Sequence, residues 1–258
     1  MTSVRHTAVI VAAGRGVRLG EMGTERPKGF IELGGTPIIE RSLACLAAAG
    51  VRRTIIVTGH LAEYYQELAR RVPGIELLHN PHYADSGSMY TLYLARARLD
   101  DDFVLLESDL VYEQRALDVL FAAPGRDTLL TSGPTQSGDE VYVEAENGRL
   151  TGLSKKRGEL KGTIIGELVG ITRLSIRGLR AMCAHAERVF SETKHLEYEQ
   201  VLVAAAREVR VDCPVVSDLA WTEIDDEGHL ARARAQVYPQ IVERDAVHAA
   251  RAHADLTR

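Results

Sequence analysis

Cysteine is scarce in this 258-residue sequence, and the cysteines that are present form no pattern. Cys45, Cys183 and Cys213 are odd in number, far apart and unlike any metal-ligand spacing. Disulfide frameworks and cysteine metal sites need paired or closely spaced residues. We therefore expect free thiols in a reducing compartment.

Long apolar runs and a secretory leader are also missing. The apolar stretches are too short to cross a bilayer, and the first residues lack the charged, apolar and cleavage-site segments of a signal peptide. We expect a cytoplasmic protein with no membrane partner.

Positive charge is not in excess: 31 Lys and Arg stand against 36 Asp and Glu, for a net charge of -5. This balance argues against a nucleic-acid partner bound by an overall basic surface. No repeat, linker or composition shift marks a boundary, so we expect a single domain over residues 1–258. Residues 237–258 are predicted to form a helical tail that packs on the domain or on a second copy in a homodimer.

Strand-like and helical patterns alternate in what is present. The first of them fall at residues 8–13, 37–49, 52–60, 61–72 and 74–80. This βαβαβ order is typical of a parallel sheet with helices on its faces. Further strands are expected at 101–110, 127–133, 208–216 and 219–224, and further helices at 89–99, 113–123, 175–189 and 197–207. Between 139 and 172 the pattern predicts an antiparallel subregion. The fold class is therefore α/β, with a Rossmann-like, mostly parallel sheet, helices on both faces and a small antiparallel subregion.

The first apolar run breaks into a basic, glycine-rich loop. Gly14 and Gly16 allow the backbone to approach a ligand and point amides at phosphate oxygens, while Arg15, Arg18 and Lys28 add positive charge. The sequence G-x-x-x-x-G-K-[ST] is absent, as is the third glycine of a dinucleotide fingerprint. The loop predicts a polyphosphate site of another kind; the plainer alternative is a solvated turn.

Carboxylates end two of the later predicted strands. Asp109 ends the strand at 101–110, and Glu223, Asp225 and Asp226 follow a short strand near the end of the chain. Two carboxylates brought together at one sheet edge suit Mg²⁺, which prefers oxygen ligands and bridges substrate phosphates. The plainer alternative is that these acids are helix caps or solvated loop residues.

Four elements together resemble the nucleotidyltransferases that activate sugar phosphates and small alcohol phosphates. They are G-x-G-x-R-L at 14–19, Pro27-Lys28, Asp109 and W-x-E-I-D at 221–225. The resemblance spans nearly the whole chain and implies the GT-A-like fold of that family.

The resemblance also implies individual roles. In that family the loop Arg and Lys bind the triphosphate, and a strand-end and a late Asp hold Mg²⁺; the matching positions are Arg18, Lys28, Asp109 and Asp225. A mid-chain lysine contacts the α-phosphate region, which implies Lys155 in GLSKK, with Lys156 as its rival. Mg²⁺ is thus the expected cofactor.

A narrower resemblance joins NPHYADSGSMYTLYLA, SGDEVYVE, GELVG and WTEIDDEGHL to phosphocholine and phosphonate cytidylyltransferases, particularly the 2-aminoethylphosphonate type. It implies that CMP passes from CTP to a small phosphonate and that pyrophosphate is released. The nucleotide-binding residues that it implies are Ala12, Ala13, Gly14, Arg15, Gly16, Asn80, Ser86, Gly87 and Ser88.

Acidic and aromatic residues of the same motifs imply an acceptor pocket suited to an ammonium group. They are Glu167, Tyr198, Glu199, Trp221 and Glu223. The alternative is that the aromatics belong to the core and that Glu199 is an exposed helix residue. A single tryptophan cannot form a cage of several, which favours an aminoalkylphosphonate over phosphocholine.

Other acceptors and another class of function remain open. Phosphocholine, inositol 1-phosphate or a sugar 1-phosphate are alternative acceptors, and a non-catalytic nucleotide-binding regulator is the alternative outside enzymes. A binder alone would not need the predicted pair of metal ligands. The histidines, including His229, are expected to be surface or capping residues because this reaction requires no proton abstraction.

Overall fold

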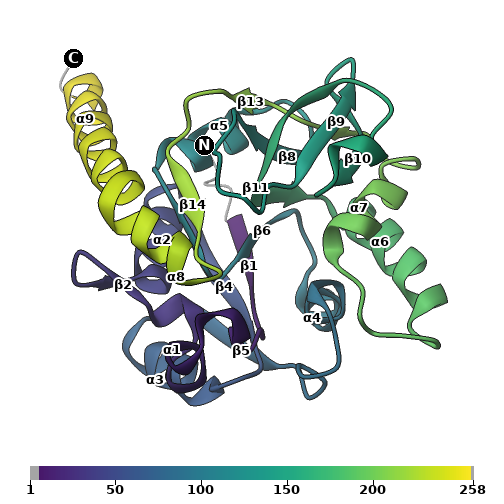
Figure 1. The fold of residues 1–258 in the computed structure, drawn as a ribbon, viewed down its shortest axis with the longest axis horizontal. Coiled ribbons are helices and arrows are strands. Elements are labelled where there is room, and N and C mark those ends of the chain that lie inside the picture. The colour runs from purple at the N-terminus through teal and green to yellow at the C-terminus, as the bar shows by residue number, and fades with distance from the viewer. Residues whose placement is uncertain (1–5, 257–258) are drawn as a thin grey trace.

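A mixed sheet of ten strands forms the centre of the molecule (Figure 1). The computed structural model describes residues 6–256, and side chains as far as residue 250. The strands of this sheet are β1 (His6–Ala12), β4 (Val51–Thr58), β5 (Ile75–His79), β6 (Phe103–Glu107), β8 (Asp127–Ser132), β9 (Tyr142–Glu146), β10 (Arg149–Ser154), β11 (Ile164–Leu174), β12 (Val211–Asp212) and β13 (Val215–Val216). Their order is β13-β8-β12-β10-β9-β11-β6-β1-β4-β5.

The half of the sheet that contains β1 is parallel, as predicted. β1 pairs with β4 on one side and with β6 on the other, and β5 pairs in parallel with β4. The register sets Val11 of β1 opposite Glu107 of β6. The carboxyl ends of these two strands therefore lie together at one edge of the sheet.

Helices cover both faces of this half because alternate strand residues point to opposite sides. Ala8 and Ile10 pack toward the helices α2 (Ile38–Ala48), α3 (Ala62–Arg71) and α5 (Arg115–Ala122). Val9 and Val11 pack toward the helices α4 (Ser88–Ala95), α6 (Ile176–Val189) and α7 (Tyr198–Ala205). Burying a side chain of this size contributes about 1.5–3 kcal/mol, so the apolar run of β1 anchors both cores.

The antiparallel region lies on the other side of β6. β11 runs antiparallel to β6, β8 and β9, and β9 and β10 form a hairpin beside it. The predicted α/β class with helices on both faces is confirmed, and the antiparallel part is wider than expected because one long strand, β11, pairs with three others.

A tight turn after β6 sets the position of Asp109. The expected strand at 101–110 ends at Glu107, and the chain turns into the separate strand β7 (Leu110–Tyr112). β7 pairs antiparallel with β14 (Trp221–Glu223), and the Ile224 amide donates to the Asp109 carbonyl at 3.1 Å. This small second sheet brings the end of β14 beside the turn that holds Asp109.

Other boundaries also differ from expectation. The expected strand at 208–216 is divided into β12 and β13, since Pro214 between them has no amide hydrogen to donate to a neighbouring strand.

The remaining short elements are η1 (Val17–Leu19), α1 (Glu21–Glu25), η2 (Lys28–Phe30), β2 (Glu32–Leu33), β3 (Thr36–Pro37), η3 (Arg96–Arg98) and η4 (Arg157–Glu159).

The chain closes with three consecutive helical segments, α8 (Glu227–Arg232), the π-helical η5 (Ala233–Val237) and α9 (Tyr238–Leu256). Ile241 of α9 is fully buried, and the far end of the helix projects from the body in Figure 1. The predicted tail at 237–258 is thus helical as far as Leu256, and its last two residues lie outside the described part. No helix among the described residues is long and apolar enough to span a membrane.

Candidate active site

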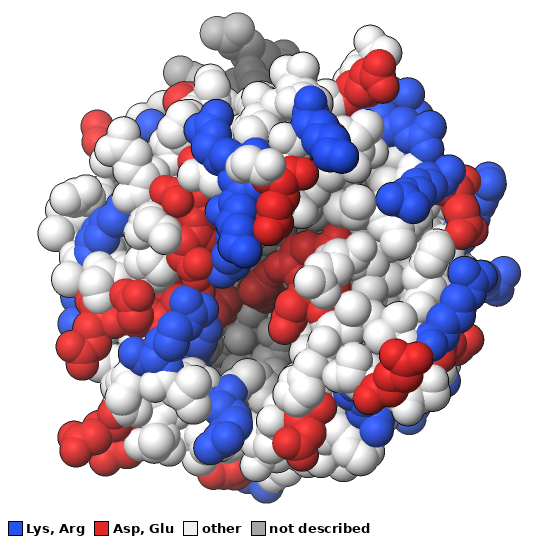
Figure 2. Space-filling view, turned by 45° about the vertical axis from the view of Figure 1, so that its right-hand side comes forward, with Lys and Arg blue, Asp and Glu red and all other residues white. Residues whose placement is uncertain are grey.

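Two pockets lie side by side at the carboxyl ends of β1 and β6. The glycine-side pocket is lined by Val11, Ala12, Ala13, Gly14, Pro27, Lys28, Tyr65, Tyr83, Ser86, Gly87, Ser88, Thr91, Glu107, Ser108, Asp109 and Glu197. The acidic pocket is lined by Arg18, Lys28, Glu107, Asp109, Ser137, Asp139, Glu140, Val141, Lys155, Leu168, Val169, Gly170, Glu197, Glu199, Trp221, Glu223 and Asp225. Four residues line both pockets: Lys28, Glu107, Asp109 and Glu197. Figure 2 shows the hollow, with carboxylates deep inside it and Lys and Arg side chains around its rim.

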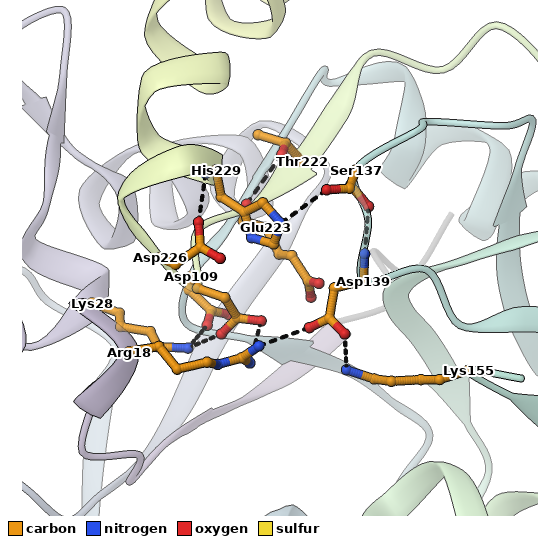
Figure 3. Close-up of polar contacts among 11 residues, drawn as sticks. Arg18, Lys28, Asp109, Ser137, Asp139, Lys155, Thr222, Glu223, Asp226 and His229 are labelled. Carbon is orange, nitrogen blue, oxygen red and sulfur yellow. Dashed lines mark hydrogen bonds and ion pairs between the residues drawn. The ribbon is translucent and has the colours of Figure 1, made fainter.

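Lys28 joins the two predicted metal ligands. Its Nζ donates to Asp109 Oδ2 at 2.7 Å and also to Asp225 Oδ1 (Figure 3). Burial of the ammonium pulls its pKa down, but the two carboxylates outweigh burial and raise the pKa above its ordinary value. Lys28 is therefore a permanent cation between two acids that are 81 and 197 residues away in the chain.

A second chain of charges crosses the acidic pocket. Arg18 pairs with Asp225 Oδ2 at 2.7 Å and with Asp139 Oδ2 at 2.9 Å, and Lys155 pairs with Asp139 Oδ1 at 2.6 Å (Figure 3). Lys156, the rival of Lys155 in the sequence, pairs with its neighbour Glu159 and lines neither pocket. The structure thus brings Lys155 to the site and leaves Lys156 outside it.

Carboxylates outnumber cations in the acidic pocket, and this excess of negative charge affects the pKa of Glu223. Burial, together with the negative charge of Asp109, Asp225 and Asp139, raises the pKa of Glu223 to about 8. Asp109 Oδ1 is itself buried without a hydrogen-bond partner. Oxygen ligands with unsatisfied lone pairs are what Mg²⁺ prefers, so the donor set of Asp109 and Asp225 fits such an ion.

A buried acidic pair lines the acidic pocket: Glu107, which also lines the glycine-side pocket, and Glu199. Tyr198 Oη donates to Glu107 Oε1 at 3.0 Å, and Glu199 Oε2 is buried without a hydrogen-bond partner. Burial, followed by the nearby Glu199 carboxylate, raises the pKa of Glu107 well above its ordinary value. Burial also raises the pKa of Glu199, to about 7. Both carboxyls lie in a place where a cation would stabilise their charged form.

The loop before α4 contributes a second wall to the glycine-side pocket. Gly87 packs against the segment that precedes α7. A Cβ on Gly87 would be 2.4 Å from the Leu196 carbonyl oxygen of that segment. The Ser88 amide and hydroxyl both donate to Glu197 Oε2, the amide at 3.0 Å. The loop is therefore fixed to the residues that precede α7.

Several predicted site residues lie away from both pockets. Asn80 is fully buried, and its amide group bonds to Ser86, Thr91 and the His82 amide, so it holds the loop from within. Glu167 Oε2 accepts from the amide and hydroxyl of Thr135 at 2.8 and 2.7 Å.

Two residues of the basic loop and two aromatics complete the predicted set. Arg15 is exposed and lines neither pocket, and Gly16 adopts a positive φ of 63° just before η1. Tyr198 is buried behind Glu107 instead of facing the acidic pocket directly. Trp221 lines that pocket, and its Nε1 is buried without a hydrogen-bond partner.

Four acidic residues that line the pockets were not predicted from the sequence: Glu107, Asp139, Glu140 and Glu197. A signal existed for Glu107, which precedes Asp109 by two residues on a predicted strand and so faces the same side. Asp139 lies inside the quoted motif SGDEVYVE, but its contact with Arg18 joins positions 121 residues apart. Nothing in the local sequence distinguishes Glu197 from other acids at the start of a helix.

The site thus consists of a glycine-lined pocket and an acidic pocket that meet at Lys28, Asp109 and two glutamates. Residues 8–150, more than half of the chain, match the family model of the MobA-like NTP transferase domain. The chain therefore belongs to the MobA-like NTP transferase family, and the nucleotidyltransferase predicted from the sequence is confirmed.

Named relatives and solved structures agree with this assignment. The chain is 33% identical over 247 residues to a CMP-5'-(3-aminopropyl)phosphonate synthase of Streptomyces rubellomurinus, over 90% of this chain but only 39% of that longer protein. It is 27% identical to a 2-aminoethylphosphonate cytidylyltransferase of Lancefieldella rimae, over 87% of this chain and 90% of the relative. The inositol-1-phosphate CTP transferase of T. maritima shares the fold, with a TM-score of 0.77 at 20% identity over 92% of this chain and 95% of that one.

Proposed function

We propose that this chain is a cytidylyltransferase that transfers CMP from CTP to a small aminoalkylphosphonate such as 2-aminoethylphosphonate. The observation that carries the proposal is the meeting of the glycine-side and acidic pockets at Lys28 and Asp109. One pocket can hold an anionic nucleotide, and the other combines carboxylates for an amine with Arg18 and Lys155 for a phosphonate. The names of the two phosphonate-related proteins support the same acceptor.

The nucleotide side follows from the basic loop. Gly14 exposes backbone at the mouth of the glycine-side pocket, where no Cβ obstructs a phosphate. Lys28 lines both pockets, and Arg18, whose side chain is about half exposed, lines the acidic one. We assign Lys28 and Arg18 to the triphosphate, and the small polar residues Ser86 to Ser88 to the base.

The reaction is an in-line displacement in which an anionic phosphonate oxygen attacks the α-phosphorus of CTP. A bond from that oxygen to the α-phosphorus forms, the bond to the β-phosphate bridging oxygen breaks, and pyrophosphate leaves with the electron pair. No proton has to be removed from the acceptor, so the protein must position two anions and balance their charge. Lys155 is placed to hold the acceptor phosphonate, and Lys28 to stabilise the departing pyrophosphate. Mg²⁺ held by Asp109 and Asp225 would supply further charge neutralisation at the phosphates.

Buried carboxyls that have no cation partner support binding of the acceptor's ammonium group. Glu107 and Glu199 belong to the acidic pocket, and an oxygen of Glu199 has no partner there. A primary ammonium has three N–H donors and can bond to both carboxylates at once. A trimethylammonium has none and needs aromatic faces, of which the acidic pocket has only Trp221. We therefore infer a preference for a primary amine.

The remaining predicted acceptor residues take supporting roles in this proposal. Tyr198 orients Glu107 through its hydroxyl, and Glu167 secures the loop that contains Thr135. Glu223 lines the acidic pocket, where the negative charge of Asp109, Asp225 and Asp139 adds to burial in raising its pKa.

Pyrophosphate release, measured for each pair of nucleotide and acceptor, tests the proposal. The panel combines CTP, UTP, ATP and GTP with 2-aminoethylphosphonate, 3-aminopropylphosphonate, ethylphosphonate, phosphocholine, inositol 1-phosphate and glucose 1-phosphate. We expect the highest kcat/KM for CTP with one of the two aminoalkylphosphonates. Ethylphosphonate, which lacks only the amine, should be at least about tenfold poorer, since losing a charged hydrogen bond costs about 1.5–3 kcal/mol. A preference for phosphocholine or a sugar phosphate would overturn the acceptor assignment.

A further inference from the structure

Glu223, Asp225 and His229 form a cluster whose ligand chemistry differs from that of the predicted Mg²⁺ pair. One carboxylate oxygen from each acid and one ring nitrogen of His229 lie within 4.8 Å of one another. Glu223 is the last residue of β14, Asp225 lies two residues beyond it, and His229 is in the first turn of α8. In Figure 3 the His229 ring lies above Glu223, on the side of the site away from Lys155.

The hydrogen bonds of His229 leave one of its nitrogens free. The ring Nε2 lies 3.2 Å from the Ser137 carbonyl oxygen. A carbonyl can only accept, so this contact requires Nε2 to carry the proton, and in the neutral ring Nδ1 then presents a lone pair. His229 is only 6% exposed, and Nδ1 is buried without a hydrogen-bond partner. Histidines that bind metals commonly donate their other ring nitrogen to a backbone carbonyl in this way.

The backbone at His229 is also fixed, by the side chain that caps α8. Asp226 caps α8, and its Oδ1 accepts the His229 amide at 2.8 Å. His229 was expected to be a surface or capping residue, but the capping residue is Asp226, and the imidazole beyond it is enclosed. The Ser137 carbonyl orients the ring, and the Asp226 cap fixes the backbone that carries it, yet Nδ1 is left buried and unpaired.

The two carboxylates of the cluster have lone pairs to offer. Glu223 makes no side-chain hydrogen bond or ion pair with any residue that the structure describes, although it lies among Asp109, Asp139 and Asp225. Asp225 pairs with Lys28 and Arg18, but a carboxylate has about four lone-pair positions, so each oxygen can also contact a cation. When Lys28 and Arg18 turn to a triphosphate, Asp225 is freed further.

We propose that Glu223, Asp225 and His229 form a divalent transition-metal site, distinct from the pair of Asp109 and Asp225 and selective for Mn²⁺, Co²⁺ or Zn²⁺ over Mg²⁺. Mg²⁺ is bound by oxygen ligands and dehydrates reluctantly, whereas imidazole nitrogen suits the transition metals. The site shares Asp225 with the Mg²⁺ pair, so an ion in it lies at the border of the acidic pocket. It does not depend on which acceptor the enzyme uses.

Pulsed electron paramagnetic resonance of Mn²⁺ bound to the full chain tests this directly. Modulation of the electron spin echo by an imidazole ¹⁴N nucleus is expected in the wild-type protein. His229→Gln should remove it, and His185→Gln should retain it, because His185 lies on α6 and pairs there with Glu208. A wild-type spectrum without nitrogen coupling, or one that survives His229→Gln, overturns the site.

Two further variants separate this site from the rest of the active site. Asp109→Asn should abolish turnover and keep the nitrogen signal, whereas loss of that signal would show that the two sites are one. Glu223→Gln leaves the imidazole in place, so it also provides a test if His229→Gln folds poorly. We expect Glu223→Gln to weaken Mn²⁺ binding by at least about tenfold in titration calorimetry and to change Mg²⁺ binding less than twofold. Equal effects on the two ions would refute the selectivity.

Discussion

Lys28 is the side chain on which the two pockets depend, since it contacts both Asp109 and Asp225 and lines both cavities. A buried ion pair is costly to break because the remaining charges stay buried. Here the remaining charges are two carboxylates, which repel each other once the ammonium is removed. We therefore expect the same residue to govern both catalysis and local stability.

Lys28→Ala is expected to lower kcat by at least about 100-fold, the usual cost of losing one group that stabilises developing charge. It should also lower the melting temperature, and Mg²⁺ should restore part of that loss by replacing the ammonium between Asp109 and Asp225. Pyrophosphate release and thermal melting with and without Mg²⁺ measure both effects. Lys156→Ala, which removes an equal charge outside both pockets, is the control. Near wild-type turnover in a folded Lys28→Ala protein would refute the assigned role.

Glu199 predicts a pH dependence of acceptor binding. Burial raises its pKa to about 7, so the carboxyl holds its proton at pH 6 and is ionised at pH 8. The KM for 2-aminoethylphosphonate should therefore fall between pH 6 and pH 8, and Glu199→Gln should flatten that change. Ethylphosphonate titrates its phosphonate in the same range without having an amine, so it corrects for the acceptor's own ionisation. An unchanged profile in Glu199→Gln would remove Glu199 from the amine site.

The sequence could predict site residues that lie just after the end of a strand. It could not predict residues for which a register shift in strand pairing decides which face of the sheet the side chain lies on. Lys28 and Asp109 come together because loops at the carboxyl ends of the parallel strands β1 and β6 share one edge. Asp225 joins them because β14, which it follows, pairs with β7 directly after Asp109. Glu167 was predicted in the pocket, but the register of β11 shifts on either side of it, and each shift changes which side chains face inward. Counting along the chain cannot reveal those shifts.

At the scale of elements, the basic loop is shaped by a contact between two backbones. Gly23 in α1 lies so close to Gly16 that a Cβ on it would be 2.1 Å from the Gly16 carbonyl oxygen. Gly16 itself has a φ of 63°, in the left-handed region that favours glycine. The loop and α1 therefore fold as one unit, which places Arg18 over Asp225 and Asp139.

Gly23→Ala is expected to displace this unit and to lower kcat/KM for CTP by at least about tenfold, because a shift of about 1 Å in a positioning group can cost 100-fold. Steady-state pyrophosphate release measures the effect. Gly158→Ala is the matched control, since a Cβ at that position has no heavy atom within 4 Å. If both variants retain wild-type kcat/KM, close packing of the loop on α1 is not needed for activity.

Element boundaries show what periodicity can and cannot predict. The apolar run at 8–13 and the amphipathic stretch at 37–49 match β1 and α2 closely, because each is long and bounded by Gly or Pro. The strand expected at 101–110 combines two strands, β6 and β7, which belong to different sheets. The turn between them exists because β7 pairs with β14, more than a hundred residues further along the chain. The local sequence pattern contains no information about that distant pairing.

At the scale of the whole molecule, α9 is attached to the body by apolar packing of Ile241 and by polar contacts, among them those of Asp245. Its carboxylate accepts the Gln114 amide at 2.7 Å and pairs with Arg41 at 2.6 Å. Val242 and Val247 on the same helix are about half exposed, at 48% and 49%. The homodimer, the single-domain organisation and the cytoplasmic location remain predictions; light scattering after size exclusion tests the first of them.

Asp245→Ala should destabilise the fold and leave catalysis intact, since it leaves the Gln114 amide and the Arg41 guanidinium without their partner. The expected cost is about 1–3 kcal/mol, and each kcal/mol lowers the melting temperature of a chain of this size by about 2–4 °C. Glu243→Ala on the same helix is the control, because Glu243 is exposed and forms no ion pair with the described residues. A melting temperature unchanged by Asp245→Ala would show that apolar packing and the ion pairs of Arg244 and His248 hold α9 without it.

The wall shared by the two pockets offers a route to inhibitors of this enzyme. Because Lys28, Glu107, Asp109 and Glu197 face both cavities, the two ligands would be separated by little more than one layer of side chains. A single compound that joins a cytidine to an aminoalkyl group through a short, uncleavable bisphosphonate could fill both cavities. Linking the two halves makes the second binding event intramolecular, which can strengthen binding by 10²–10⁴ without a new contact.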